Sequence, residues 1–190
     1  MNKTTHILGG VTLALGTAIK IELPEYSVVS LGCLAAAASF GALIPDIDKR
    51  KTAISSKHPF VSFFIRLFTT HRGFTHSLLA LVLIAGTLYF ITPHITLIML
   101  SVAHYAPFTR AFIRDNIHLL TWINYGIMNG YFSHIVLDML NPDGVPLFFP
   151  LSNHFSICKI KTGGAGEKCV RTFLFLLSIY LVWISIKNLI

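Results

Sequence analysis

Apolar residues gather in long runs along this chain, and the short stretches between the runs carry most of the charge. A helix that crosses the hydrocarbon core of a bilayer needs about 20 mostly apolar residues. Five runs approach that length: residues 5–19, 28–44, 78–91, 121–140 and 173–186. They predict an all-α fold, a polytopic helical membrane protein with about five transmembrane helices in a single integral-membrane domain, residues 1–190.

The segment between the third and fourth runs fits this pattern less well. Residues 95–106 are apolar, but the segment is too short to span a bilayer unaided. We therefore expect a short re-entrant or interfacial helix within a non-cytoplasmic insertion, residues 93–120. The turn signal Asn141-Pro142-Asp143-Gly144 then ends the fourth run, and Pro146 and Pro150 favour an apolar loop after it.

Small residues recur four positions apart on three of the runs. Such spacing lets neighbouring helices approach closely in a membrane. The pairs are Gly10 and Ala14, Ala37 and Gly41, and Gly126 and Gly130.

The composition agrees with a membrane protein. Hydrophobic residues make up 54% and charged residues 12% of the chain, whereas a soluble domain is about a quarter charged. The formal charge of +7 could indicate nucleic-acid binding, but basic residues also collect in the cytoplasmic loops of membrane proteins. We therefore expect membrane lipid as a partner and no nucleic acid.

Ionisable side chains stand at the ends of the apolar runs. Such groups are costly at bilayer depth, so they usually face the interior of a helix bundle and mark a site. Imidazoles and carboxylates that converge on one point are the ligands of divalent metals. The candidate metal ligands are His6, Asp46, Asp48, His71, His76, His134 and Asp138.

Counting the five crossings places all these candidates on one side of the membrane. The same count puts most of the 15 lysines and arginines on that side, including those of a basic loop, residues 46–76, and of a second loop, residues 141–170. The positive-inside rule then makes this side the cytoplasm. The predicted site therefore faces the cytoplasm.

Each part of the set also has a simpler explanation. His134 and Asp138 share one helix face and could form a buried hydrogen bond instead of binding a metal. The basic residues 49–51 could neutralise Asp46 and Asp48 as well as a metal could. The block His71 to His76 could be a basic loop at the lipid headgroups. His6 alone could simply be a polar residue at a helix end. The hypothesis of a metal site therefore depends on all the candidates lying on the same side of the membrane.

Four imidazoles and three carboxylates are enough for one or two metal ions. Zinc suits these donors, and manganese or iron are alternatives. Two close metals suit phosphoester hydrolysis by a metal-activated water. In that reaction Asp46 or Asp48 could serve as general base, and the guanidinium of Arg72 could bind the anionic phosphoester.

Three cysteines are too few for a disulfide scaffold. Cys158 and Cys169 could bind zinc together with His154, but their spacing matches no common zinc motif.

Several motifs together resemble the LexA-regulated, membrane-bound, predicted metal-dependent hydrolase family, the YdjM family. They are Thr5-His6, Leu43-Ile44-Pro45-Asp46-Ile47-Asp48, His71-Arg72-Gly73-Phe74-Thr75-His76-Ser77, and Gly130-Tyr131-Phe132-Ser133-His134 through Asp138. The resemblance implies a multi-pass protein of the bacterial inner membrane with metal-dependent hydrolase activity. Where the family often has a basic or histidine residue after its aspartates, this chain has Lys49. A looser likeness in residue order to zinc-dependent phospholipase C favours phosphodiesters as substrates.

The sequence thus predicts a membrane-bound metal-dependent hydrolase that cleaves phosphoesters of a lipid or membrane-associated substrate. Two alternatives stay open. One is a non-catalytic membrane protein with a structural His/Asp metal or hydrogen-bond network. The other is a metal-ion transporter, although transporter sites lie at the bilayer midplane rather than at one face.

Overall fold

The computed structural model of the protein describes residues 1–21, 23–24, 26–49, 56–57, 60, 63, 73–151 and 153–189. Within these ranges the chain is helical and forms no strand beyond one isolated antiparallel bridge between Val145 and Phe155. The long helices are α1 (Lys3–Ala18), α2 (Val28–Gly41), α5 (Leu78–Tyr105), α7 (Leu119–Met139) and α8 (Ala165–Lys187). The all-α fold class is therefore confirmed.

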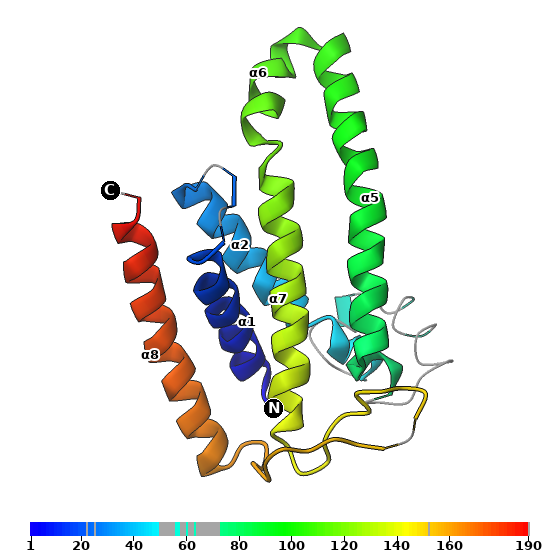
Figure 1. The fold of residues 1–190 in the computed structure, drawn as a ribbon, viewed down its shortest axis with the longest axis vertical. Helices are drawn as coiled ribbons and strands as arrows, with labels where there is room; N and C mark the ends of the chain where they lie inside the picture. The colour runs from blue at the N-terminus through cyan, green and yellow to red at the C-terminus, as the bar shows by residue number, and fades with distance from the viewer. Residues whose placement is uncertain are drawn as a thin grey trace.

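The short elements lie between these helices. The 3-10 turns η1 (Pro45–Asp48) and η2 (Phe74–His76) flank the stretch in which few residues are described, and α6 (Pro107–Asn116) connects α5 to α7. Figure 1 shows the long helices alternating in direction along the chain, so that η1, η2 and the ends of α1 and α7 meet at one end of the bundle. This is the end to which the crossing count assigns the ionisable side chains.

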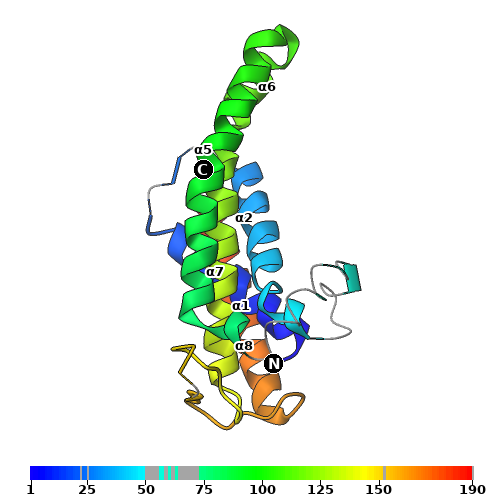
Figure 2. The same cartoon turned by 90° about the vertical axis from the view of Figure 1, so that its right-hand side faces the viewer.

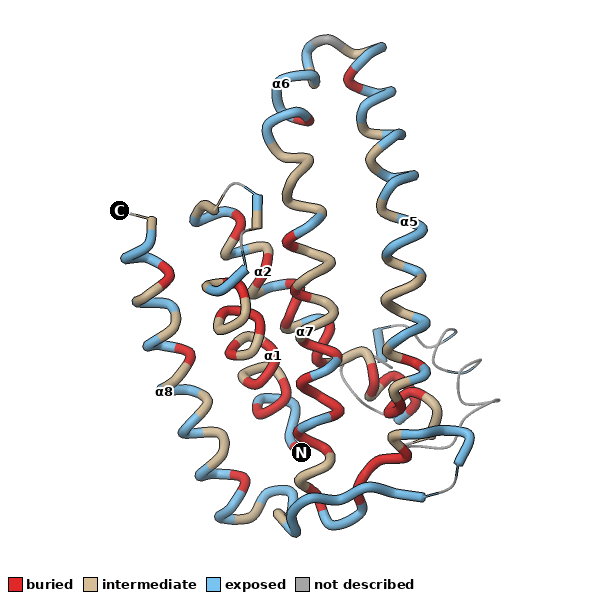
Figure 3. The backbone as a smooth tube through the Cα atoms, in the orientation of Figure 1, coloured by how far each residue is buried: buried red, intermediate tan, exposed pale blue. Residues whose placement is uncertain are grey.

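Three segments are long and apolar enough to cross a membrane: Val28–Asp48, Leu78–Tyr105 and Ala165–Lys187. Figure 3 shows that α5 and α8 expose most of their surface, whereas α1 and α7 carry most of the buried residues. Exposed apolar side chains such as Phe90, Phe173 and Trp183 cover the two outer helices. In a bilayer this surface meets lipid.

The short helix predicted for residues 95–106 is wrong as a separate element. The structure continues α5 through Pro93 to Tyr105, and Pro93 lies inside the helix. The ring of proline removes one backbone hydrogen bond, but long apolar helices tolerate this loss. At 1.5 Å per residue the 28 residues of α5 span about 42 Å, more than the roughly 30 Å hydrocarbon core. Figure 2 accordingly shows the α5–α6 end projecting beyond α1 and α2.

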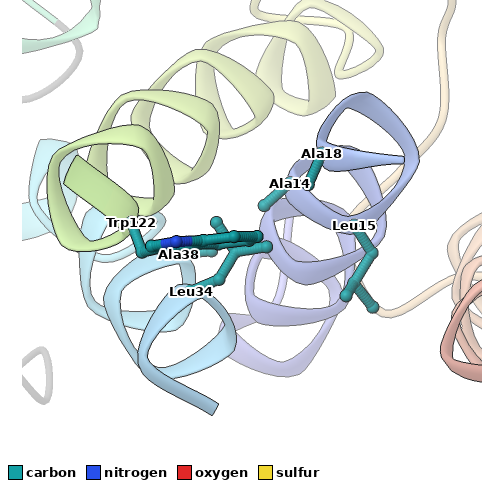
Figure 4. Close-up of a cluster of buried hydrophobic side chains, with 6 residues drawn as sticks. All are labelled: Ala14, Leu15, Ala18, Leu34, Ala38 and Trp122. Atoms are coloured by element: carbon teal, nitrogen blue, oxygen red, sulfur yellow. The ribbon is translucent and has the colours of Figure 1, made fainter. Parts of the chain in front are cut away.

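Helices α1, α2 and α7 form the tightest part of the bundle. Leu34, Ala38 and Trp122 pack against Ala14 and Leu15 in a buried cluster, drawn in Figure 4. The Trp122 indole N–H donates to the carbonyl of Pro24, which satisfies its one polar atom. This cluster fixes α7 against α1 and α2 from one side.

Glycines bring the same three helices into backbone contact. A Cβ on Gly130 would lie 2.1 Å from the Ala38 carbonyl oxygen, and one on Gly126 would lie 2.6 Å from that of Leu34. A Cβ on Gly41 would lie 2.3 Å from the carbonyl oxygen of Ile127. The close packing predicted from the small-residue pairs is therefore confirmed for α2 and α7, and it sets the position of His134 on α7.

Candidate metal centre

Three imidazoles and one carboxylate meet at the end of the bundle. His6 comes from α1, His76 from η2, and His134 and Asp138 from successive turns of α7. Each side chain has at most 4% of its surface exposed. Elements far apart in the sequence thus bring their metal-binding atoms to one buried point.

The distances join the Nε2 atoms of the histidines to the two oxygens of Asp138. His6 Nε2 lies 3.4 Å from Oδ1, whereas His76 Nε2 and His134 Nε2 lie 3.6 Å and 3.7 Å from Oδ2. The Nε2 atoms of His76 and His134 are 3.3 Å apart. Tetrahedral zinc with bonds near 2.0–2.1 Å separates neighbouring ligand atoms by about 3.4 Å, so the triangle formed by His76 Nε2, His134 Nε2 and Asp138 Oδ2 suits such an ion.

The backbone fixes which nitrogen of His134 faces the centre. Its Nδ1 lies 2.6 Å from the carbonyl oxygen of Ala42, at the end of α2. A carbonyl oxygen only accepts, so Nδ1 carries the proton and the neutral ring presents an Nε2 lone pair to the cluster. His134 also stacks on His6, with ring centroids 3.7 Å apart and an interplanar angle of 9°.

His76 is oriented in a similar way by its neighbours. Its Nδ1 lies 3.1 Å from Thr75 Oγ1 and 3.5 Å from Asp48 Oδ2. The Thr75 hydroxyl donates its only proton to Asp48, so its oxygen accepts from Nδ1 of His76. The neutral ring therefore presents its Nε2 lone pair to the same cluster.

Two lone pairs thus face each other across 3.3 Å, beside a carboxylate. This arrangement repels unless a cation or a proton lies between the nitrogens. Burial lowers the pKa of His76, while the hydrogen bond to Asp48 acts in the opposite direction. The low pKa disfavours the proton and favours the neutral, metal-binding form of the ring.

Asp138 has further partners besides the imidazoles. Its Oδ1 accepts from the amino group of Met1 at 2.6 Å and from the side-chain amide of Asn141 at 2.8 Å. These contacts hold Oδ1 on the His6 side and leave Oδ2 toward His76 and His134. A carboxylate held in this way has a fixed direction for a metal ion.

Two overlapping ligand groups can be distinguished within the described residues. His6, His134 and Asp138 form one, and Asp46, His76 and His134 form the other, with the metal-binding atoms of each group within 4.8 Å of one another. Because Nδ1 of His134 is engaged by Ala42, His134 has one nitrogen to offer and can serve one ion at a time. The donor set fits a divalent cation of the zinc type.

The structure places the other predicted residues less centrally. Asp46 is half-buried and belongs to the second ligand group, whereas Asp48 is buried and contacts Nδ1 of His76 rather than Nε2. Asp48 is thus better placed to orient His76 than to bind a metal beside Nε2. His71 and Arg72 lie outside the described residues.

Sequence reasoning missed two residues that build the site. Thr75 joins Asp48 to His76, and the Tyr131 hydroxyl donates to the Thr75 carbonyl. The neighbouring Ser77 caps α5 by accepting from the N–H of Ala80. Thr75 lies between two histidines of the motif, so its position was the available signal.

The alternative zinc group of cysteines finds no support in the described part of the chain. Cys158 and Cys169 are exposed free thiols, and His154 Nδ1 lies 3.0 Å from the carbonyl of Asp143. Neither ligand group described above includes a cysteine.

Comparison with known proteins decides the family. The family model described as "YdjM inner membrane protein" matches residues 1–189. The chain belongs to the YdjM family. No solved structure matches.

Two bacterial proteins are similar to this chain over most of its length. The chain is 30% identical to the uncharacterized protein YvsG of Bacillus subtilis, over 95% of this chain and 93% of that one. It is 31% identical to the inner membrane protein YdjM of Escherichia coli over 74% of this chain. The matched part spans 61% of that relative. Together with the apolar helices, YdjM membership makes the chain an inner-membrane protein.

Proposed function

We propose that the protein is a membrane-bound metal-dependent hydrolase that cleaves phosphoester bonds of a lipid or membrane-associated substrate. The observation that supports this most strongly is the pair of opposed Nε2 atoms beside Asp138, since a divalent cation between them would remove their repulsion. His6, His134 and Asp138 would hold a divalent ion, zinc by donor type, with His76 and Asp46 of the overlapping group nearby. Such an ion supplies Lewis-acid activation of water and of a phosphoryl oxygen.

The chain's own residues would complete the reaction. Asp46 is the half-buried carboxylate of the cluster, so it can accept a proton from an attacking water while the more deeply buried groups stay in place. Asp48 would hold His76 through its Nδ1. Arg72, which follows the histidine of the motif, would bind the anionic phosphoryl group.

The test starts from the protein purified in detergent, with its metal content measured. We expect bound divalent metal, and hydrolysis of bis(p-nitrophenyl) phosphate or of phospholipid in mixed micelles. His134→Ala should lose both metal and activity, whereas His94→Ala should lose neither, because His94 is exposed on α5. Asp46→Asn should keep metal and lower the turnover number. Protein that neither contains nor takes up metal would contradict the proposal.

The depth of the centre favours a second function, a structural metal site. The three histidines and Asp138 are buried and join α1, η2 and α7, which is what a stabilising centre requires. In that case His134→Ala lowers the melting temperature and metal content, but no phosphodiester is turned over by the unmodified protein. The hydrolysis assay separates the two functions.

A further inference from the structure

An apolar groove runs beside the metal centre between α1, α7 and α8. Its volume is about 430 Å³, within the range of small-molecule sites. Residues of α1 form the floor, Phe132 and Leu137 of α7 form one wall, and Leu174, Leu177 and Leu181 of α8 form the other. The groove exists because α8 packs against α1, and α1 has glycines at the floor positions Gly9 and Gly16.

One end of the groove lies within a helical turn of the metal centre, although none of the candidate ligands lines it. Gly9 lies one turn after His6 on α1, and Ser133 precedes His134 on α7. From Gly9 to Thr17 the floor extends about 12 Å at the rise of an α-helix. A molecule with its reactive end at the histidines would therefore have its tail in this groove.

The polar atoms of the lining are few, and one stands out. Thr12 donates to the Leu174 carbonyl, and Thr17 donates to that of Leu13, so both hydroxyls are engaged. Ser133 lines the groove with 5% of its surface exposed, and its buried hydroxyl has no hydrogen-bond partner among the described residues. A buried hydroxyl without a partner costs free energy, which an acceptor atom on a bound molecule would recover.

We propose that this groove binds one acyl chain of a bilayer glycerolipid, whose ester carbonyl oxygen accepts a hydrogen bond from Ser133. The outer face of α8 exposes Phe175, Leu176 and Ile179, so the groove is continuous with the surface that meets lipid. Lipid acyl chains are abundant at that surface, and their apolar character suits the leucine side chains of the groove walls. The assignment of this groove to the acyl chain of the substrate rests on the proposed function. Lipid binding in the groove can nevertheless be measured without hydrolysis.

The experiment uses the full chain in nanodiscs that contain a glycerolipid with a diazirine in its acyl chain. After illumination, the labelled residues are mapped by mass spectrometry. We expect labelling of the groove walls to exceed that of the exposed α8 face several-fold. Gly16→Leu, which fills the floor toward Leu181, should abolish the excess, whereas Gly32→Leu should not, because Gly32 faces open space on α2.

Two further readouts make the assignment specific. Ester-linked chains should label the groove more than ether-linked chains, and Ser133→Ala should remove that difference, since an ether lacks the carbonyl acceptor. Metal content of Gly16→Leu should stay unchanged, which separates failure of the groove from failure of the metal centre. Equal labelling of the groove and the outer face, or crosslinks between two copies of the chain in place of lipid adducts, would overturn the proposal.

Discussion

Gly130→Ala should destabilise the protein because the new methyl group meets only backbone. Its Cβ would lie 2.1 Å from the Ala38 carbonyl oxygen, 2.9 Å from the carbonyl carbon of Ala38 and 2.7 Å from the Ala42 nitrogen. Ordinary contacts begin near 3.4 Å, so α2 and α7 must separate by about 1 Å. No flexible side chain can move aside in this contact.

The magnitude follows from two opposing effects. Overpacking costs about 1–3 kcal/mol, and a clash with rigid backbone belongs at the upper end of that range. The helix propensity of alanine over glycine returns about 1 kcal/mol. We therefore expect a net loss of about 2 kcal/mol, which lowers the melting temperature of a chain of this size by roughly 4–8 °C.

The effect should reach the metal centre as well. His134 lies one turn after Gly130, and its Nδ1 bonds the carbonyl of Ala42, so parting the helices stretches the contact that orients the ring. Metal affinity should fall together with stability. Mutation of a lipid-facing glycine would not have this effect.

The assay is thermal unfolding in detergent with and without added zinc, and Gly32→Ala is the matched control. Gly32 has no atom within 4 Å of its Cβ position, so this change should be neutral or raise the melting temperature. If Gly130→Ala matched Gly32→Ala in stability and in zinc affinity, the packing argument would be refuted.

Three further outcomes can be measured in the same preparation. Zinc at about 100 times its dissociation constant should stabilise the protein by about 2.7 kcal/mol and a chelator should reverse this, as seen in the melting temperature. Zinc affinity, followed by calorimetry, should be retained near neutral pH and fall as the pH drops below 6.5, because the pKa of His76 lies below that value and protons compete for Nε2 only in acid. Tyr131→Phe should cost about 1 kcal/mol in denaturant unfolding through its lost bond to Thr75, and an unchanged midpoint would show that bond to be dispensable.

The helical class and most of the helix bounds could be predicted from the sequence because long apolar runs have few other structures available in a bilayer. The glycine contacts could be predicted too, since Gly126 and Gly130 sit four apart on one helix face. The continuation of α5 to Tyr105 could not be predicted, because the effect of Pro93 depends on whether its surroundings tolerate one missing hydrogen bond. The last apolar run was predicted to begin at residue 173, whereas α8 begins at Ala165. Its first turns contain charged residues such as Glu167 and Lys168, which interrupt the apolar pattern.

The candidate site likewise has some features that the sequence predicts and others that only the fold determines. His6, His76, His134 and Asp138 were predicted from their chemistry and sidedness, and the structure brings them together. The Ala42 carbonyl that orients His134 could not be predicted, because every residue carries a carbonyl and only the fold selects one. Asp48 was predicted as a ligand, but it contacts Nδ1 of His76 instead. Sequence spacing cannot tell which ring nitrogen a carboxylate will approach.

Glu167 links the two ends of the sequence beside this centre. Its carboxylate accepts from the backbone N–H of Asn2, the Thr5 hydroxyl and the backbone N–H of Gly163, so the first turn of α8 holds the start of α1. During synthesis, His6 enters the membrane long before α7 delivers Asp138 and before α8 supplies this clamp. The chain must therefore be almost completely inserted before these imidazoles and Asp138 can meet, so any ion held there would bind late in biogenesis.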